Sequence, residues 1–272
     1  MEFFLAYSFM QRALFAGIFI ATTCAILGVF LVLRKDAMLG HGLAHITFGG
    51  VALGLILHIT PMIAALIIAV VCAVGIIKLR ERAGVYEDTA IGIFSSIGMA
   101  IGIILASLAG SFNVDLMSYL FGNILAISGT EVWFSMVLTL IACAAITLYY
   151  QEFLFITFDP DSAKASGIRV RGLESIMIIL TAMVVVLGMK IVGLLLVTAL
   201  VVIPAAAGLQ MAKSFFHAIL ISMLVAVISV IVGLWLAFYL NVPASGSIIL
   251  LSALFFLLLF SFRMIVSRTK TA

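Results

Sequence analysis

Long uncharged runs of apolar residues recur along the whole chain, and this feature limits the fold more than any other. A membrane-spanning helix needs about 20 apolar residues to cross a hydrocarbon core of roughly 30 Å. Hydrophobic residues make up 66% of the sequence and charged residues only 9%, with a mean hydropathy of +1.41. A water-soluble domain carries far more charge than this. The chain is therefore expected to be an all-α integral membrane protein.

Charged and turn-forming residues divide the chain into eight or nine predicted transmembrane helices. The least regular span is 191–209, because Lys190 barely separates it from the span before it and Pro204 interrupts it. A broken or re-entrant segment would fit that stretch equally well. The predicted spans are 13–33, 40–58, 62–77, 89–109, 132–150, 175–189, 191–209, 215–240 and 247–262.

The basic residues predict the orientation of the bundle, because lysine and arginine favour the cytoplasmic side of short loops. With the loop 78–88 placed inside, twelve of the fourteen basic residues lie on the cytoplasmic side. Only Arg12 and Lys190 then remain outside. The sequence therefore predicts an outer N-terminus and a cytoplasmic C-terminus.

The loops give no sign of a soluble domain or of catalysis, so residues 1–272 are interpreted as a single transmembrane domain. The sequence contains no GxxxxGK[ST] phosphate loop, no HExxH motif and no paired mid-span carboxylates. We therefore expect a chain that is not itself an enzyme, with no catalytic residues, no tightly bound cofactor and no nucleic-acid partner. Any ATP-driven function would need a motor from another subunit.

One predicted cytoplasmic loop carries the signals of a short helix over residues 159–167. Asp159 is suited to cap the helix, Pro160 fits its first position, and Gly167 is suited to end it. A helix of this length is marginal in water, so it needs packing to persist. It is either an ordinary capped connector or a lever that a cytoplasmic partner grips.

Several sequence blocks together resemble one family, the permeases of metal ABC importers that take up zinc and manganese. The resemblance covers most of the chain and implies the fold of these permeases with its short cytoplasmic coupling helix. The blocks are GLAHITFGGVALG at 42–54, DLMSYLFGNIL at 115–125, the DPxxAxxxG pattern of the short helix, KIVGLLLVTALVVIPAAAG at 190–208 and VPASGSIILLSALFF at 242–256.

The resemblance also implies partners and a location. A permease of this family pairs with a second copy and with cytoplasmic ABC ATPase subunits, and receives metal from an extracytoplasmic metal-binding protein. The chain would then lie in the plasma or inner membrane of a prokaryote. The residues that the ATPase would contact are Asp159, Pro160, Asp161, Ala163, Lys164 and Gly167. For the charged members of this set, simple solvation is the alternative interpretation.

Two histidines at membrane depth are the first candidates for metal ligands, because ionisable groups in a span are costly. His41 and His45 stand four residues apart, which places both imidazoles on one face of a helix. Nitrogen ligands suit zinc and other late first-row divalent ions. The resemblance places His45 on the family's pathway histidine and His41 where the family generally carries an aspartate. The alternative is a wet interfacial His41 and a His45 bonded to a neighbouring helix.

Three further polar residues are weaker candidates. Asp115 follows the stretch GSFNV at 110–114 on the predicted outer side and is either a pathway ligand or the cap of a short segment at 116–122. His58 precedes an outer turn, where it would meet incoming metal or simply contact water. His217 lies near the cytoplasmic face and is equally suited to be an interfacial anchor.

The sequence thus predicts the permease subunit of an ATP-binding-cassette importer for a divalent transition-metal ion. Zinc is the first candidate, with manganese or iron as alternatives, because the ligand types overlap. The competing hypothesis is a secondary-active transporter of metal ions or small solutes. That class favours inverted repeats and buried mid-membrane acids, and neither is found in this sequence.

Overall fold

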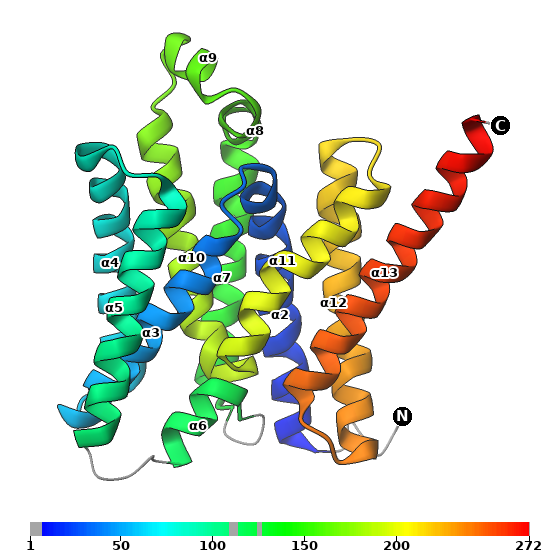
Figure 1. Ribbon diagram of the computed structural model, residues 1–272. Helices are drawn as coiled ribbons and strands as arrows, with labels where there is room; N and C mark the ends of the chain where they lie inside the picture. Colours follow the sequence, from blue (N-terminus) through cyan, green and yellow to red (C-terminus); the bar gives the residue numbers. More distant parts are fainter. Residues whose placement is uncertain (1–6, 109–113, 124–126, 272) are drawn as a thin grey trace.

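The computed structural model describes residues 7–108, 114–123 and 127–271, and every element in these ranges is an α-helix. Nine of the described helices are long and apolar enough to cross a membrane. Figure 1 shows them gathered side by side in one bundle, which confirms the predicted fold class. They are α2 (Ser8–Leu33), α3 (Met38–Ile56), α4 (Pro61–Ala83), α5 (Glu87–Leu108), α7 (Gly129–Leu148), α10 (Val170–Val192), α11 (Leu194–Met211), α12 (Phe215–Leu240) and α13 (Ala244–Thr271).

Most helices extend beyond the predicted spans. The bounds of α12 agree with the prediction, but α4 continues past residue 77 to Ala83 and α10 begins at Val170 instead of 175. The basic residues treated as breaks lie in the last turn of α4, where cations interact favourably with the helix dipole. Charge therefore marks where a helix leaves the bilayer, and not where the helix ends.

The boundary between α10 and α11 lies at Gly193, not at Lys190 as predicted. Gly193 has φ +91°, a conformation that L side chains rarely adopt. A Cβ atom built on Gly193 would lie 2.5 Å from the carbonyl carbon of Phe121, so the backbones are in direct contact. After this break, α11 runs as one helix through Pro204 to Met211. The described segment is continuous and not broken at the proline.

Three shorter helices connect the spans: α6 (Val114–Phe121), α8 (Tyr150–Phe158) and α9 (Pro160–Ala165). The sequence predicted no helix between the span that ends at 150 and the short helix that begins at 159, but α8 occupies this stretch. Phe153 and Ile156 of α8 are buried, and the Phe153 ring lies 5.8 Å from the ring of Phe30. Burial against α2 therefore stabilises a short helix that would be marginal alone.

The helices differ in how deeply they are buried. Most of the span windows of α2, α3 and α10 are buried in the bundle, whereas those of α5 and α13 are largely exposed. The exposed side chains of α5 and α13 are mainly isoleucine, leucine and phenylalanine. In a membrane, this apolar surface faces lipid or another protein.

The contact between α3 and α5 depends on small residues. A Cβ atom on Gly49 would lie 2.4 Å from the backbone oxygen of Gly98. Glycine lets two helix backbones approach this closely in a membrane. The helix that carries both candidate histidines is therefore packed firmly against α5.

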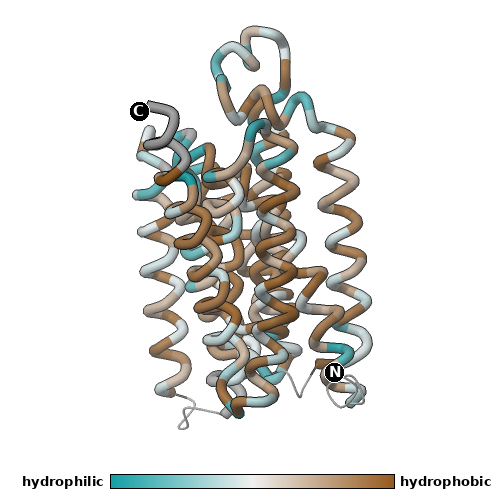
Figure 2. The backbone as a smooth tube through the Cα atoms, turned by 90° about the vertical axis from the view of Figure 1, so that its right-hand side faces the viewer, coloured by the Kyte–Doolittle hydropathy of each residue, from teal (hydrophilic) through white to brown (hydrophobic). Residues whose placement is uncertain are grey.

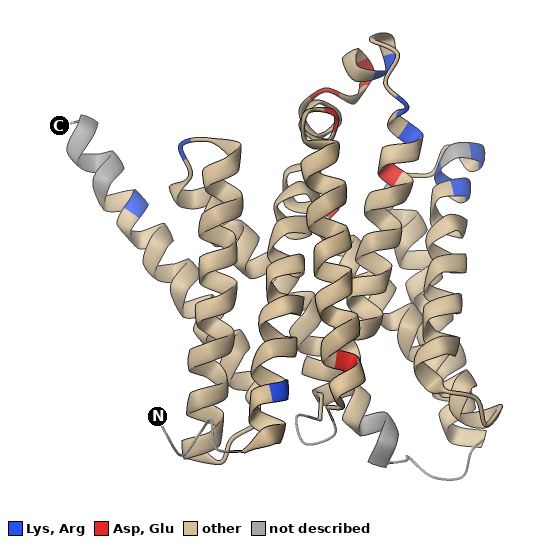
Figure 3. Cartoon of the chain, turned by 180° about the vertical axis from the view of Figure 1, so that it is seen from behind, with Lys and Arg blue, Asp and Glu red and all other residues tan. Residues whose placement is uncertain are grey.

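Charge is concentrated at one end of the bundle. Figure 3 shows most of the lysine, arginine, aspartate and glutamate residues toward the end of the bundle from which α9 projects. Figure 2 shows the same end as the more hydrophilic one, while the helix shafts are largely hydrophobic. We call this the α9 end, and it corresponds to the predicted cytoplasmic side.

Candidate metal site and the α9 end

His41 and His45 face one another on the first turns of α3, as their spacing predicts. Their Nε2 atoms are 3.0 Å apart, and the ring centroids are 4.5 Å apart with the planes at 89°. A hydrogen bond between two imidazoles needs one N–H donor and one bare nitrogen. At least one ring therefore presents a nitrogen that can bind a metal.

The separation of the two Nε2 atoms suits a shared zinc ion. Zinc binds imidazole nitrogen at about 2.0–2.1 Å in a tetrahedral site, which places two ligand nitrogens roughly 3.3 Å apart. The observed separation is 3.0 Å. A small rotation of either ring, moving its Nε2 atom by a few tenths of an ångström, would thus admit the ion between the two nitrogens.

The histidine pair is accessible from one side. His41 is exposed and His45 is half-buried. The Nδ1 atom of His45 is buried and has no hydrogen-bond partner among the described residues. No group of three or more histidine, cysteine, aspartate or glutamate side chains that could hold a metal occurs among the described residues. Within that part of the chain, one subunit offers an open pair of ligands and not a closed cage.

Neither His58 nor His217 joins this pair. His58 follows the end of α3, and at about 1.5 Å per residue the end of the helix lies roughly 16 Å beyond His45. It is exposed and has φ +54°. Asp115 is the second residue of α6, within the first turn and not at the cap. Its side chain lies outside the described residues. His217 instead receives a hydrogen-bond contact from Ser214, with Oγ and Nδ1 2.7 Å apart, at the start of α12.

The short helix α9 forms with the predicted local signals, although it is slightly shorter than 159–167. Asp159 accepts a hydrogen bond from the Ser162 N–H at 3.0 Å. These hydrogen bonds hold the pKa of Asp159 below its ordinary value, so the cap is ionised at neutral pH. Gly167 has φ +85°, and the Ile168 N–H donates to the Ala163 carbonyl at 3.1 Å. This is the bonding of a Schellman motif.

The surface of α9 presents charge around an open cleft. Asp161 and Lys164 are exposed, whereas Ala163 is fully buried and anchors the helix. A cleft of about 640 Å³ lies beside α9, and its lining residues come from α4, α9 and α10 and from the connection between α9 and α10. Its charged lining residues are Arg80, Asp161, Lys164, Arg169, Arg171 and Glu174.

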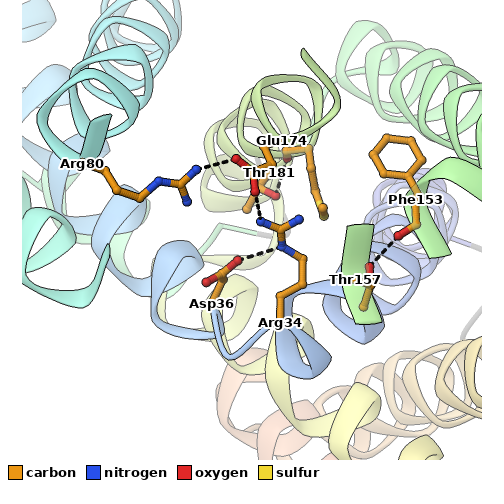
Figure 4. Close-up of polar contacts among 8 residues, drawn as sticks. Arg34, Asp36, Arg80, Phe153, Thr157, Glu174 and Thr181 are labelled. Carbon is orange, nitrogen blue, oxygen red and sulfur yellow. Dashed lines mark hydrogen bonds and ion pairs between the residues drawn. The ribbon is translucent and has the colours of Figure 1, made fainter. Parts of the chain in front are cut away.

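Arg80 and Glu174, which line this cleft, also belong to a cluster of largely buried ions that the sequence did not predict. Arg34, Asp36, Arg80 and Glu174 form it, and we call it the ion-pair cluster (Figure 4). Arg34 donates to Glu174 at 2.6 Å and to Asp36 at 3.0 Å, and Arg80 donates to the other oxygen of Glu174. The sequence indicated only that all four residues lie on the predicted cytoplasmic side.

A second ion pair lies at the opposite end of the bundle. Lys190 of α10 pairs with Glu131 of α7, whose side chain is buried. Glu131 also belongs to a capping box, in which Ser128 and Glu131 satisfy one another's backbone N–H groups at the start of α7. Lys190 was interpreted as a separator between spans, but it ties α10 to α7 instead.

Known proteins resemble the chain over nearly its full length. The ABC 3 transport family matches residues 6–263. The "Manganese transport system membrane protein MntC" of Listeria monocytogenes is 30% identical over 96% of this chain and 93% of its own length. The "High-affinity zinc uptake system membrane protein ZnuB" of Haemophilus influenzae is 33% identical over 93% of this chain and 97% of its own.

A solved structure supports the same relationship. The structure titled "PsaBC from Streptococcus pneumoniae in complex with Fab" contains a chain that is 33% identical to this one. The two superpose with a TM-score of 0.83 over 93% of this chain and 91% of the other.

Proposed function

The chain belongs to the ABC 3 transport family, and from this membership we propose that it is the permease subunit of an ATP-driven importer that carries a divalent metal ion into the cytoplasm. It is a multi-pass protein of the bacterial inner membrane. Relatives named for manganese and for zinc transport match it about equally well. The choice between these ions therefore has to rest on the residues of this chain.

The His41–His45 pair is the observation that carries the proposal of zinc. Both groups that converge here are imidazoles, with Nε2 atoms 3.0 Å apart. Imidazole suits zinc, whereas manganese prefers carboxylate, carbonyl and water oxygen. Because two ligands hold an ion weakly, the pair is suited to brief coordination during passage and not to storage.

The other parts of the transporter would come from other subunits. A second copy of the chain would bring a second histidine pair to the shared path, giving four nitrogens, the coordination number that zinc prefers. Cytoplasmic ATPase subunits would grip α9, where Asp159, Asp161 and Lys164 are exposed. An extracytoplasmic metal-binding protein would deliver the ion at the opposite end, where His58 is the candidate first contact and Asp115 a further candidate ligand of the path. ATP-driven closure of the ATPases would then move the two α9 helices and open the path alternately to either side.

Reconstitution tests this proposal. The chain is purified with its ATPase and placed in vesicles, and zinc and manganese uptake are followed with and without ATP on the ATPase side. We expect uptake to require ATP and zinc to be preferred over manganese. Uptake that persists without ATP and collapses with the ion gradient would refute the importer and favour a secondary transporter.

A further inference from the structure

The ion-pair cluster is difficult to explain by stability alone. The side chains of Arg34, Asp36 and Glu174 are 10%, 14% and 11% exposed, so each has lost most of its water. Replacing a buried ion pair by well-packed apolar residues often leaves stability unchanged or raises it. A cluster with three ion pairs near the α9 end therefore calls for a role other than holding the fold together.

One side of the cluster is attached to α9. The Schellman motif of α9 ends at Ile168, whose carbonyl accepts the Val170 N–H at 2.9 Å where α10 begins. Glu174 lies in the second turn of α10, five positions into that helix. Because α9 and α10 are joined by this short hydrogen-bonded link, a displacement of α9 moves the Glu174 carboxylate.

The other side of the cluster is attached to the helix that carries the histidines. Asp36 accepts from Arg34 through its carboxylate, and its backbone carbonyl accepts the Leu39 N–H at 3.0 Å at the start of α3. The connection is tight, since Lys35 has φ +65°. His41 follows Asp36 by five residues, which is about 7.5 Å along a helix axis. The position of Arg34 thus sets the position of the first turn of α3.

Glu174 connects α10 to two other parts of the chain. One of its oxygens accepts from Arg34 in the connection between α2 and α3, and the other accepts from Arg80 at the end of α4 (Figure 4). Arg34 also has a buried Nη1 without a hydrogen-bond partner among the described residues. That donor is available for a second acceptor when the carboxylate shifts.

From these contacts we infer that Glu174 is a positioning residue that transmits the movement of α9 through Arg34 and Asp36 to the histidine pair on α3. The inference rests on the proposed function, because it assigns a route to the coupling between ATP hydrolysis and metal passage. When α9 moves, Glu174 displaces Arg34, and Arg34 displaces the start of α3. The two imidazoles then open or close on the ion.

The test is the number of metal ions carried per ATP hydrolysed, measured on the whole complex in vesicles. This ratio does not depend on how much protein folds, so a purely structural role would leave it unchanged. We expect Glu174→Gln, which keeps the shape and removes the charge, to lower the ratio by about tenfold, within the usual range of coupling between sites. ATP hydrolysis itself should continue.

Two control variants should carry as many metal ions per ATP hydrolysed as the unmodified chain. Arg82→Gln removes an exposed cation two residues from Arg80 on the same helix. Thr139→Val removes a buried hydrogen bond to Thr23, 2.8 Å long, which joins α2 to α7 away from the cluster. We expect the second control to lower the melting temperature and to leave the ratio unchanged.

A second pair of variants decides the question if Glu174→Gln fails to assemble. Arg80→Gln removes one of the two cations that hold Glu174, whereas Arg80→Lys keeps the charge. We expect the ratio to fall in Arg80→Gln and to recover most of its value in Arg80→Lys.

The outcomes separate this inference from the proposed function. If the unmodified complex shows no ATP-dependent uptake, the proposed function fails before any variant is compared. If it shows uptake and the assembled Glu174 and Arg80 variants carry as many ions per ATP as it does, within about twofold, the coupling route is wrong. The coupling route is also wrong if ATP hydrolysis and metal uptake fall in the same proportion in these variants.

Discussion

Replacing Gly193 by alanine should destabilise the bundle at the junction of α10 and α11. The residue has φ +91° and ψ 152°, a region that is almost exclusive to glycine and costs other residues roughly 1–3 kcal/mol. The new Cβ atom would also lie 2.5 Å from the Phe121 carbonyl carbon and 2.6 Å from the Gly122 nitrogen. These are backbone atoms, so no side-chain rotation relieves the collision.

The magnitude follows from adding the two effects. Overpacking a close contact costs about 1–3 kcal/mol, so together with the backbone strain of about 1–3 kcal/mol the total is about 2–6 kcal/mol. For a domain of this size, 1 kcal/mol shifts the melting temperature by roughly 2–4 °C. We therefore expect Gly193→Ala to melt at least about 4 °C lower than the unmodified chain in the same detergent.

Gly92→Ala is the matched control for this experiment. Gly92 lies within α5, and a Cβ atom there would meet nothing within 4 Å. Alanine in a helix interior is about 0.5–1 kcal/mol more favourable than glycine, so the melting temperature should stay the same or rise slightly. If the two variants melt at the same temperature, the close contact between α6 and the α10–α11 junction is wrong.

Three further predictions concern the candidate sites. His41→Asp places an oxygen ligand beside His45, and competition uptake should then shift from zinc toward manganese by about tenfold; an unchanged preference would mean that position 41 does not select the ion. Asp159→Ala removes the cap of α9, so the affinity of the ATPase for the permease should fall in a binding assay. Ser175→Ala, at a half-buried position of α10, should leave it unchanged. Lys190→Met leaves the buried Glu131 without its cation and should lower the melting temperature more than Lys190→Arg does; equal melting temperatures would argue against the pair.

The parts of the fold that depend on local chemistry were predictable from the sequence. The apolar runs predicted the spans. Asp159, Pro160 and Gly167 predicted α9, because the geometries that cap and end a helix depend on only a few residues. The spacing of His41 and His45 likewise predicted their meeting on one helix face. The cap, the helix end and the histidine pair are each decided within about one helical turn.

The parts that depend on tertiary packing were not predictable. Arg34 and Glu174 are separated by 140 residues, and no pattern in the sequence pairs them. The helix α8 was missed because its apolar residues continue the preceding span in composition, and only burial of Phe153 against Phe30 defines it. The break at Gly193 depends on the approach of Phe121 from another segment, which a single sequence does not reveal.

Zinc uptake by the His45→Ala variant tests the central claim most directly, because that claim is that the histidine pair on α3 handles the ion. The variant is reconstituted with its ATPase beside a His217→Gln control, whose histidine contacts Ser214 at the start of α12 and not the pair. Assembly is checked by the melting temperature of the complex. We predict that His45→Ala assembles but takes up no zinc above background, while the control transports normally. Zinc uptake by His45→Ala at the rate of the unmodified complex would contradict the account.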